Sequence, residues 1–309
     1  MGDRTSSERK QPSGLVGFLR RLVKEKPLGT VGLVIVLLLL FFGIFANYLA
    51  PYGMNQTNVV DRLAPPSAQY LMGTDNLGRD ILSRVIYGAR ISLNVGLSAT
   101  AVSLIVFLTI GILSGYIGGK FDLIVQRFVD SIMSIPGLIL LMVIMSIVGV
   151  GFGPIIIVVG ILMGIGGSRI IRGAVISIKE EVYVQAAIAI GCPTHRVLLR
   201  HILPNISALA VTLFSIQVPE AILIESTLSF LGLGIPPPDP SWGGMISGSA
   251  RSWMIKAPWM VIWPGLVLSI VVYGTNMFGD AVRDLLDPKL KGGIGRYGVK
   301  IKKFSKSKA

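Results

Sequence analysis

Residues 28–49, LGTVGLVIVLLLLFFGIFANYL, form a stretch of 22 residues without one charged side chain. A helix of this length, with a rise of about 1.5 Å per residue, extends about 33 Å and can cross the hydrocarbon core of a bilayer. The stretch is longer than the apolar region of a signal peptide, and no A-x-A cleavage motif follows it. We therefore expect it to be retained as a first transmembrane helix.

The rest of the chain has the same apolar character. Of its 309 residues, 52% are hydrophobic and 15% are charged, against roughly 25% charged residues in soluble domains. Mean hydropathy is +0.70. Further apolar runs occupy residues 91–116, 131–148, 154–171, 206–231 and 259–279. The sequence thus predicts an all-α polytopic membrane protein with six transmembrane helices.

Lysine and arginine residues concentrate on the cytoplasmic side of membrane proteins. If the N-terminus is inside, the inner segments hold 23 of the 29 basic residues: 1–27, 117–130, 169–205 and 283–309. This bias predicts that both termini are cytoplasmic. It also explains the net charge of +13 by contact with anionic lipid rather than with nucleic acid.

The predicted organisation has five parts. They are a cytoplasmic tail over 1–27 with an amphipathic helix at 14–26, a first transmembrane helix over 28–49, an extracytoplasmic segment over 50–90, a core over 91–282 that holds five transmembrane helices and a cytoplasmic loop at 172–205, and a basic cytoplasmic tail over 283–309.

The sequence contains no pattern for a catalytic or metal site. A single cysteine, Cys192, excludes an intramolecular disulfide, and the two histidines, His195 and His201, belong to no HExxH or CxxC pattern. A G-x-S-x-G elbow and a G-x4-GK-[ST] phosphate loop are also absent. Energy for pumping must therefore come from another protein.

The predicted inner loop carries the most informative pattern, EEVYVQAAIAIGCPTHRVLLRHILPN at residues 180–205. Its first eleven residues favour a helix, Gly191 ends that helix, and Pro193 suits the first turn of a second helix that Pro204 stops. We expect a helix–turn–helix whose small side chains, Ala186, Ala187 and Ala189, allow close approach of another protein.

This loop resembles the EAA loop of ABC-importer permeases, EAA-x3-G-x9-I-x-L-P. Gln185-Ala186-Ala187, Gly191 and His201-Ile202-Leu203-Pro204 occupy the motif positions, with Gln185 and His201 in place of the usual Glu and Ile. The resemblance implies that the loop couples the permease to an ATPase. The residues to which it assigns this role are Gln185, Ala186, Ala187, Gly191, Pro193, Arg196, Arg200, His201, Leu203 and Pro204.

Three further motifs resemble the dipeptide, oligopeptide and nickel branch of these permeases. They are GTDNLGRD at 73–80, LSFLGLG at 228–234 and RDLLDP at 283–288, and the N-terminal arrangement is similar to the "C" type of permease subunit. The resemblance implies the type I ABC-importer (MetI-like) permease fold, in a multi-pass protein of a bacterial or archaeal plasma membrane.

The resemblance also implies partners. It predicts a heterodimer with a homologous permease, two cytoplasmic ATPase subunits that bind ATP and Mg²⁺, and an extracytoplasmic binding protein that delivers di- or oligopeptides for import by alternating access. No cofactor is expected on this chain itself. Nickel chelates, glutathione and oligosaccharides remain alternative substrates, and nothing in the residues excludes a homodimer.

Polar residues outside the loop give weaker indications. Carboxylates in transmembrane segments are costly, so Glu220 and Glu225 are candidates for the translocation path, with a buried interhelical hydrogen bond as the alternative. The two extracytoplasmic segments are either connections or a docking surface for an external partner. The candidate docking residues are Asp75, Arg79, Asp80 and Trp242.

Small residues and prolines mark special points in the spans. The pairs Gly111/Gly115 and Gly160/Gly164 have GxxxG spacing, which predicts close helix packing, with a hinge as the alternative. Pro136 is expected to kink its span.

Two other classes of protein compete with the permease interpretation. A stand-alone secondary transporter normally shows repeats and broken helices, and it leaves the inner loop unexplained. A membrane-embedded enzyme lacks any supporting motif.

Overall fold

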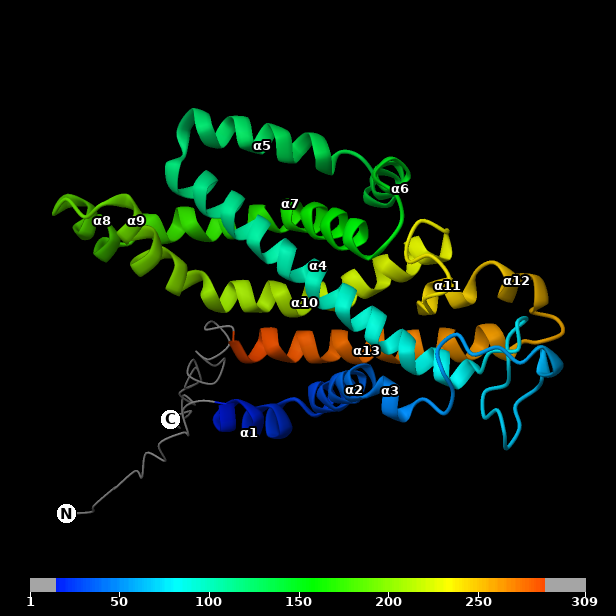
Figure 1. Cartoon of the computed structure of the whole chain (residues 1–309). Coiled ribbons are helices and arrows are strands. Elements are labelled where there is room, and N and C mark those ends of the chain that lie inside the picture. Colours follow the sequence, from blue (N-terminus) through cyan, green and yellow to red (C-terminus); the bar gives the residue numbers. More distant parts are fainter. Residues whose placement is uncertain (1–14, 287–309) are drawn as a thin grey trace, which may run out of the picture.

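The computed structural model describes residues 15–286, which form an elongated helical bundle (Figure 1). In chain order the elements are α1 (Leu15–Glu25), α2 (Pro27–Ile44), α3 (Ala46–Leu49), η1 (Val59–Asp61), α4 (Ile81–Ile117), α5 (Gly119–Met133), α6 (Gly137–Val148), α7 (Phe152–Lys179), α8 (Val182–Ala189), α9 (Thr194–Val197), η2 (Leu198–Ile202), α10 (Leu203–Phe230), α11 (Trp242–Ile246), α12 (Ser249–Trp253) and α13 (Trp259–Leu286).

Five stretches of helix are long and apolar enough to cross a membrane. They are α2, α4, α7, α13 and the stretch Thr194–Phe230, which joins α9, η2 and α10. α5 and α6 are long and apolar enough to cross a membrane only when they are counted together, and the pair is bent by 90°. The predicted all-α membrane fold is therefore confirmed, and the described residues hold five continuous spans, or six if the bent pair is counted.

The α4–α7 interface is built on the glycine pairs. A Cβ added at Gly160 of α7 would lie 2.6 Å from the carbonyl oxygen of Ala99 and from the Cβ of Val102 on α4. Likewise, a Cβ at Gly111 of α4 would lie 2.7 Å from Ile171 and from the carbonyl oxygen of Ser168. Only glycine permits this distance between the helices, so the structure confirms the packing role of these pairs.

The predicted third span, 131–148, is not a single helix. α5 ends at Met133, and α6 begins at Gly137 in a direction 90° away. Pro136 lies at this break as the residue before α6. Because proline lacks an N–H and its ring collides with the carbonyl four residues earlier, the expected kink is a complete break.

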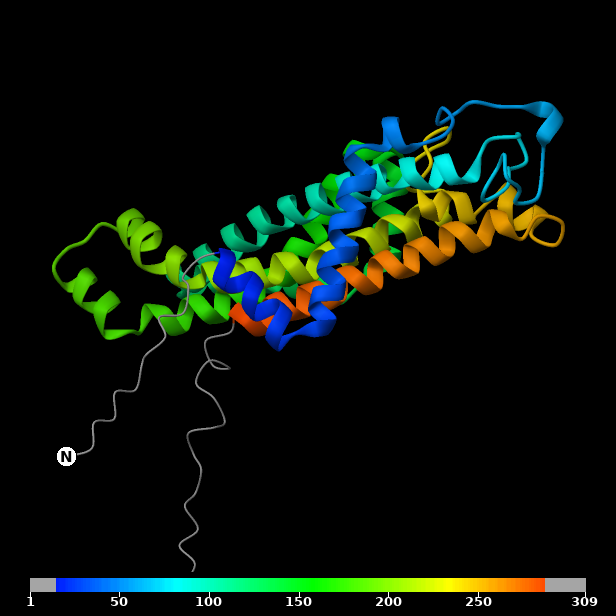
Figure 2. The same ribbon diagram turned by 90° about the horizontal axis from the view of Figure 1, so that it is seen from below.

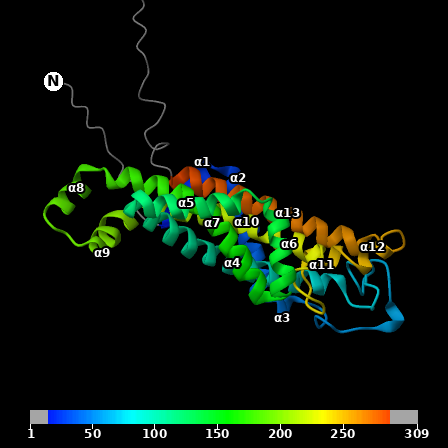
Figure 3. The ribbon, with the colours of Figure 1, turned by 90° about the horizontal axis from the view of Figure 1, so that it is seen from above.

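α5 instead lies along α7, held by ion pairs (Figure 3). Asp122 accepts hydrogen bonds of 2.6 and 2.5 Å from the Nε and Nη2 atoms of Arg172. Asp130 pairs with Arg169 in the same way, nearer the end of α5. These contacts hold α5 on the face of the bundle opposite to α2.

Two predicted segments contain residues that are helical in the structure. α4 begins at Ile81, so residues 81–90 of the predicted extracytoplasmic segment 50–90 are helical. α7 continues to Lys179, so residues 172–179 of the predicted loop 172–205 are helical as well. In both cases the helix extends beyond its apolar core, because hydropathy marks the membrane-embedded part and not the whole helix.

The molecule has two distinct ends (Figures 1 and 2). We call α8, α9 and η2 with their connection (residues 182–202) the hairpin. It lies at the same end as α1 and the C-terminal end of α13. We call residues 50–80 together with α11 and α12 the cap, which lies at the other end. Most of the basic tail predicted over 283–309 lies outside the described residues.

Helices α1 and α2 pack on α13. Leu22 of α1 is fully buried against Ala281 and Leu285. The ammonium group of Lys26 lies 2.5 Å from a carboxylate oxygen of Asp284. These contacts place α1 across the end of α13, as expected for an amphipathic helix that lies along a membrane surface.

Candidate functional site

The turn of the hairpin depends on Gly191. Its φ angle of +81° is the left-handed conformation that side-chain-bearing residues rarely adopt. The amide of Gly191 donates to the carbonyl of Ile188, and the amide of Cys192 donates to that of Ala187. This pair of bonds is the Schellman motif that ends a helix. The predicted end of the first helix at Gly191 is confirmed.

The second helix of the hairpin does not stop at Pro204, contrary to the sequence prediction. α9 passes into the π-turn η2, where the amide of Leu203 donates to the carbonyl of Leu198 five residues earlier, and then into α10. The wider turn accommodates Pro204, which has no N–H to donate and needs room for its ring. The hairpin is therefore a rigid extension of the α10 span.

The inner side of the hairpin is anchored in the bundle. Val184, Val197 and Ile202 are fully buried in a cluster with Phe107 and Ile171. Of the residues predicted for coupling, Ala187 is buried and His201 and Leu203 are half-buried. The remainder are exposed: Gln185, Ala186, Gly191, Pro193, Arg196, Arg200 and Pro204.

The outer side of the hairpin presents apolar side chains that the sequence analysis did not single out. Val182 is 83% exposed and Ile190 is 85% exposed, and Leu199 and Tyr183 are exposed as well. Exposed apolar surface on a well-ordered element marks an interaction site. Gln185 itself donates a 2.8 Å hydrogen bond to the carbonyl of Lys179, so it ties α8 to the end of α7.

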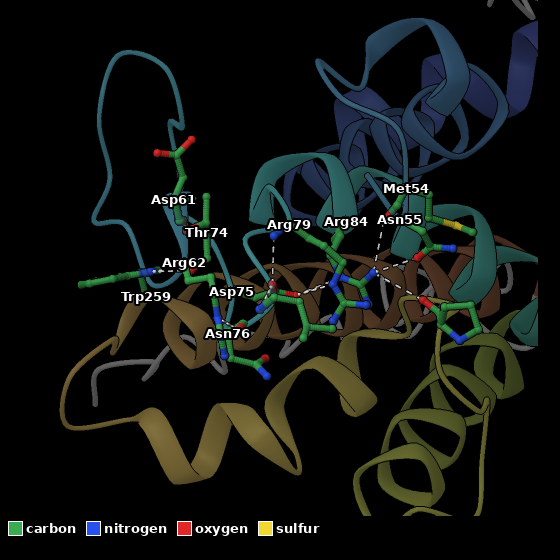
Figure 4. A network of polar contacts seen from close by, with 12 residues as sticks. Met54, Asn55, Asp61, Arg62, Thr74, Asp75, Asn76, Arg79, Arg84 and Trp259 are labelled. Carbon is green, nitrogen blue, oxygen red and sulfur yellow. Dashed lines mark hydrogen bonds and ion pairs between the residues drawn. The ribbon is translucent and has the colours of Figure 1, made fainter. Parts of the chain in front are cut away.

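The cap is organised by Asp75 (Figure 4). One carboxylate oxygen accepts hydrogen bonds from the amides of Leu77 and Arg79, at 2.8 and 3.0 Å. The other accepts a 2.6 Å bond from Nε of Arg79 and lies 4.0 Å from Nε of Arg84. The GTDNLGRD motif thus forms a closed turn that a carboxylate holds together.

Arg84, a buried residue that the sequence analysis did not select, joins distant parts of the cap. Its Nη1 atom donates to the carbonyls of Met54 and Pro238, at 3.2 and 3.3 Å, and to the side chain of Asn55 (Figure 4). Nε1 of Trp259 donates 3.1 Å to the carbonyl of Thr74. Because the partners are far apart in sequence, no local pattern could have revealed them.

Three of the four predicted docking residues are buried: Asp75, Asp80 and Trp242. Asp80 accepts a hydrogen bond from the amide of Ser83 and is the N-cap of α4. The Nε1 atom of Trp242 donates 3.0 Å to the carbonyl of Val85. These three side chains bond within the protein, and their burial gives no support to the expected docking role.

The two membrane carboxylates have different surroundings. Glu225 is fully buried and accepts a 2.7 Å hydrogen bond from Ser229, with Ser226 at 3.4 Å. The sequence analysis held a buried interhelical hydrogen bond as the alternative; the bonds seen here are buried but lie within α10. Glu225 therefore does not reach the surface of the described residues. Glu220 is exposed and lines a groove of about 480 Å³ between α5, α6, α7 and α10.

Gln217 lies one turn before Glu220 and lines the same groove. Its side-chain oxygen accepts a 2.7 Å hydrogen bond from Ser103 of α4, and its Nε2 atom contacts the carbonyl of Met163 of α7 at 3.4 Å. The floor of the groove is therefore fixed by bonds between three helices. We call this feature the α10 groove.

The family of the chain follows from comparison with known proteins. Residues 107–292, more than half of the chain, match the family described as "binding-protein-dependent transport system inner membrane component". Residues 15–66 match the "N-terminal TM domain of oligopeptide transport permease C". The chain belongs to this family of inner-membrane transport components.

Individual relatives cover nearly the whole chain. It is 39% identical to a dipeptide transport system permease of Alkalihalophilus pseudofirmus, over 87% of this chain and 88% of that one. It is 37% identical to an oligopeptide transport system permease of Bacillus subtilis, with the same coverage. It is 38% identical to a glutathione transport system permease of Pectobacterium atrosepticum, over 89% and 91%.

These matches confirm the resemblance on which the sequence analysis relied. The protein is a membrane-embedded permease subunit of an ABC importer, with the MetI-like fold, and ATP is hydrolysed by separate subunits.

Proposed function

We propose that this permease imports di- or oligopeptides by alternating access and is coupled to its ATPase through the hairpin. The observation that carries the coupling role is the row of exposed apolar side chains on the hairpin, headed by Val182 and Ile190. Such a surface needs a protein partner. The continuous helix from α9 into α10 transmits movement of the hairpin directly to the groove that Glu220 lines.

The proposed orientation places the hairpin end in the cytoplasm and the cap outside. The basic residues of α1 and the hairpin lie at one end of the molecule, in agreement with the positive-inside rule (Figure 1). An ATPase with bound ATP and Mg²⁺ would meet the hairpin there. Among the predicted docking residues, Arg79 is the one proposed to contact an external partner. Its amide and its Nε atom bond to Asp75, and its Nη atoms make no bond within the described cap.

The proposed translocation path runs along the α10 groove. An ionisable side chain at membrane depth faces protein or water and not lipid. Exposed Glu220 therefore indicates that the homologous permease covers this face and that water and substrate pass between the two subunits. A carboxylate at this position attracts the amino terminus of a peptide.

Uptake by the reconstituted importer tests this function. The permease, its homologous partner, the ATPases and the binding protein are placed in proteoliposomes, with ATP and labelled substrates. We expect ATP-dependent accumulation of di- or oligopeptides. Accumulation of glutathione or a nickel chelate, with no uptake of other peptides, would refute the substrate assignment and leave the permease assignment intact.

A further inference from the structure

A second groove lies on the opposite face of the bundle from Glu220. It has a volume of about 510 Å³, runs between α2, α4, α10 and α13, and reaches Phe18 of α1. Two of its lining side chains carry a hydroxyl, and both hydroxyls are satisfied within their own helices. Ser215 donates to the carbonyl of Thr212 at 2.9 Å, and Thr275 donates to that of Val271 at 2.7 Å. The lining side chains thus offer an occupant apolar contacts alone.

The groove is one leaflet deep. Along α13 it runs from Thr275 to Leu286, and along α10 from Val211 to Ile222. At about 1.5 Å per residue each of these distances is about 16 Å. Half of the hydrocarbon core is about 15 Å thick. An acyl chain of one leaflet therefore matches the groove in length and in polarity.

Basic residues surround the mouth of this groove at the hairpin end. Phe18 and Leu286 line the mouth. Residues three apart are neighbours on a helix surface, so Arg21 lies beside Phe18 and Arg283 lies beside Leu286. Arg21 is half-buried and Arg283 is exposed. Lipid head groups lie at this level if the acyl chain fills the groove.

The cap end of the same face provides a comparison. A smaller apolar groove of about 250 Å³ lies there between α2, α4 and α13. Arg21 at the hairpin end bonds to a single partner, the exposed Glu25, at 3.3 and 3.4 Å. At the cap end, Arg90 follows the lining residue Ala89 and bonds to three partners. Its three guanidinium nitrogens donate to the carbonyl of Gly43, the side chain of Asn47 and the carbonyl of Ile44, at 3.0, 3.1 and 3.4 Å.

We propose that the groove at the hairpin end binds an acyl chain of an anionic phospholipid, whose phosphate is held by Arg21 of α1 and by Arg283. The lipid fills the space between α1, α2 and the α10–α13 pair and fixes α1 on the membrane surface. This site is separate from the α10 groove, and it does not depend on which solute the importer carries.

Native mass spectrometry of the complete importer in mild detergent tests the site. The probes are dioleoyl phosphatidylglycerol and its neutral control, dioleoyl phosphatidylcholine. Val211→Trp fills this groove, and Ile270→Trp fills the cap-end groove; these residues are 51% and 47% exposed, so the two variants are matched. We expect the wild type and Ile270→Trp to retain the anionic lipid and Val211→Trp to lose it.

A charge variant separates the head group from the acyl chain. Arg21→Gln combined with Arg283→Gln should reduce the preference for the anionic lipid by about tenfold without filling the groove. Equal retention of both lipids by the wild type overturns the proposal, as does equal retention by the two tryptophan variants. If Val211→Trp releases the homologous permease instead of lipid, the groove is a subunit interface and the proposal is wrong.

Discussion

At the scale of single residues, Glu220 and Glu225 show how position on one helix determines role. Five residues advance an α-helix by about 140°, so the two side chains leave α10 on different sides. Glu225 enters the protein and meets serine hydroxyls, whereas Glu220 remains exposed in the α10 groove. One carboxylate therefore stabilises the region where α10 meets the cap, and the other is exposed on the proposed translocation path.

Replacing Glu225 by alanine should destabilise the permease by about 2–4 kcal/mol, because the hydroxyls of Ser226 and Ser229 lose their acceptor and a cavity remains. Glu225→Gln keeps an acceptor oxygen and should cost less. The measurement is the thermal unfolding midpoint in detergent. An alanine variant as stable as the wild type would show that the buried bonds contribute nothing.

Glu220→Gln should leave stability and ATPase association unchanged. It should raise the KM for uptake of peptides with a free amino terminus by about tenfold, the effect of losing a charged hydrogen bond. N-acetylated peptides are the control, since they carry no terminal charge. An equal change for both kinds of peptide would contradict a role in attracting the amino group.

Gly191→Val should weaken coupling to the ATPase, because a side chain in left-handed conformation costs roughly 1–2 kcal/mol or more. Asparagine tolerates this conformation, so Gly191→Asn should be milder. Gly232→Val is the matched control, with the same φ of +81° and an equally open surrounding at the cap end. The readouts are ATPase co-purification and peptide uptake. Loss of co-purification in both valine variants would indicate general misfolding.

The sequence was sufficient to predict that the first helix of the hairpin ends at Gly191, because a helix end depends on the few residues that form it. It was not sufficient for Trp242, whose partner Val85 is 157 residues away. Asp80 is different, because its partner Ser83 lies three residues on, and the sequence analysis did not use this local capping signal. Glu225 likewise needs Ser229 on the same side of the helix in a buried place. Residue types alone left its two roles undecided.

At the scale of elements, close packing of α4 on α7 depends on glycine residues, which have no Cβ atom. Gly160→Ala should destabilise the protein by about 1–3 kcal/mol, because its Cβ collides with α4. Gly173→Ala on the same helix meets no atom within 4 Å and should be neutral or slightly stabilising. Comparison of the two unfolding midpoints is the measurement, and equal values would remove the basis of this packing argument.

Hydropathy predicted the long spans well because each buries one continuous apolar stretch. It failed for 131–148, where the apolar run is divided by Pro136 and the charged part of α5 is attached to α7. Asp122 and Arg172 are 50 residues apart in sequence, so their pairing was not visible there. Helix direction after a proline depends on such tertiary contacts.

At the scale of the whole molecule, the hairpin and the cap lie at opposite ends (Figures 1 and 2). The continuous helix from Thr194 to Phe230 connects the ends. The two large grooves are lined by different sets of helices, apart from α10, which lines both. In the proposed function the ATPase meets the hairpin end and the binding protein meets the cap end.

The central claim is that the hairpin is the ATPase contact, and photo-crosslinking in the assembled importer tests it most directly. A photoreactive amino acid is placed at Ile190 of the hairpin or at Leu71 of the cap, both exposed. We predict an adduct with the ATPase from residue 190 and none from residue 71. An ATPase adduct from residue 71, or none from residue 190 in an importer that transports, would contradict the account.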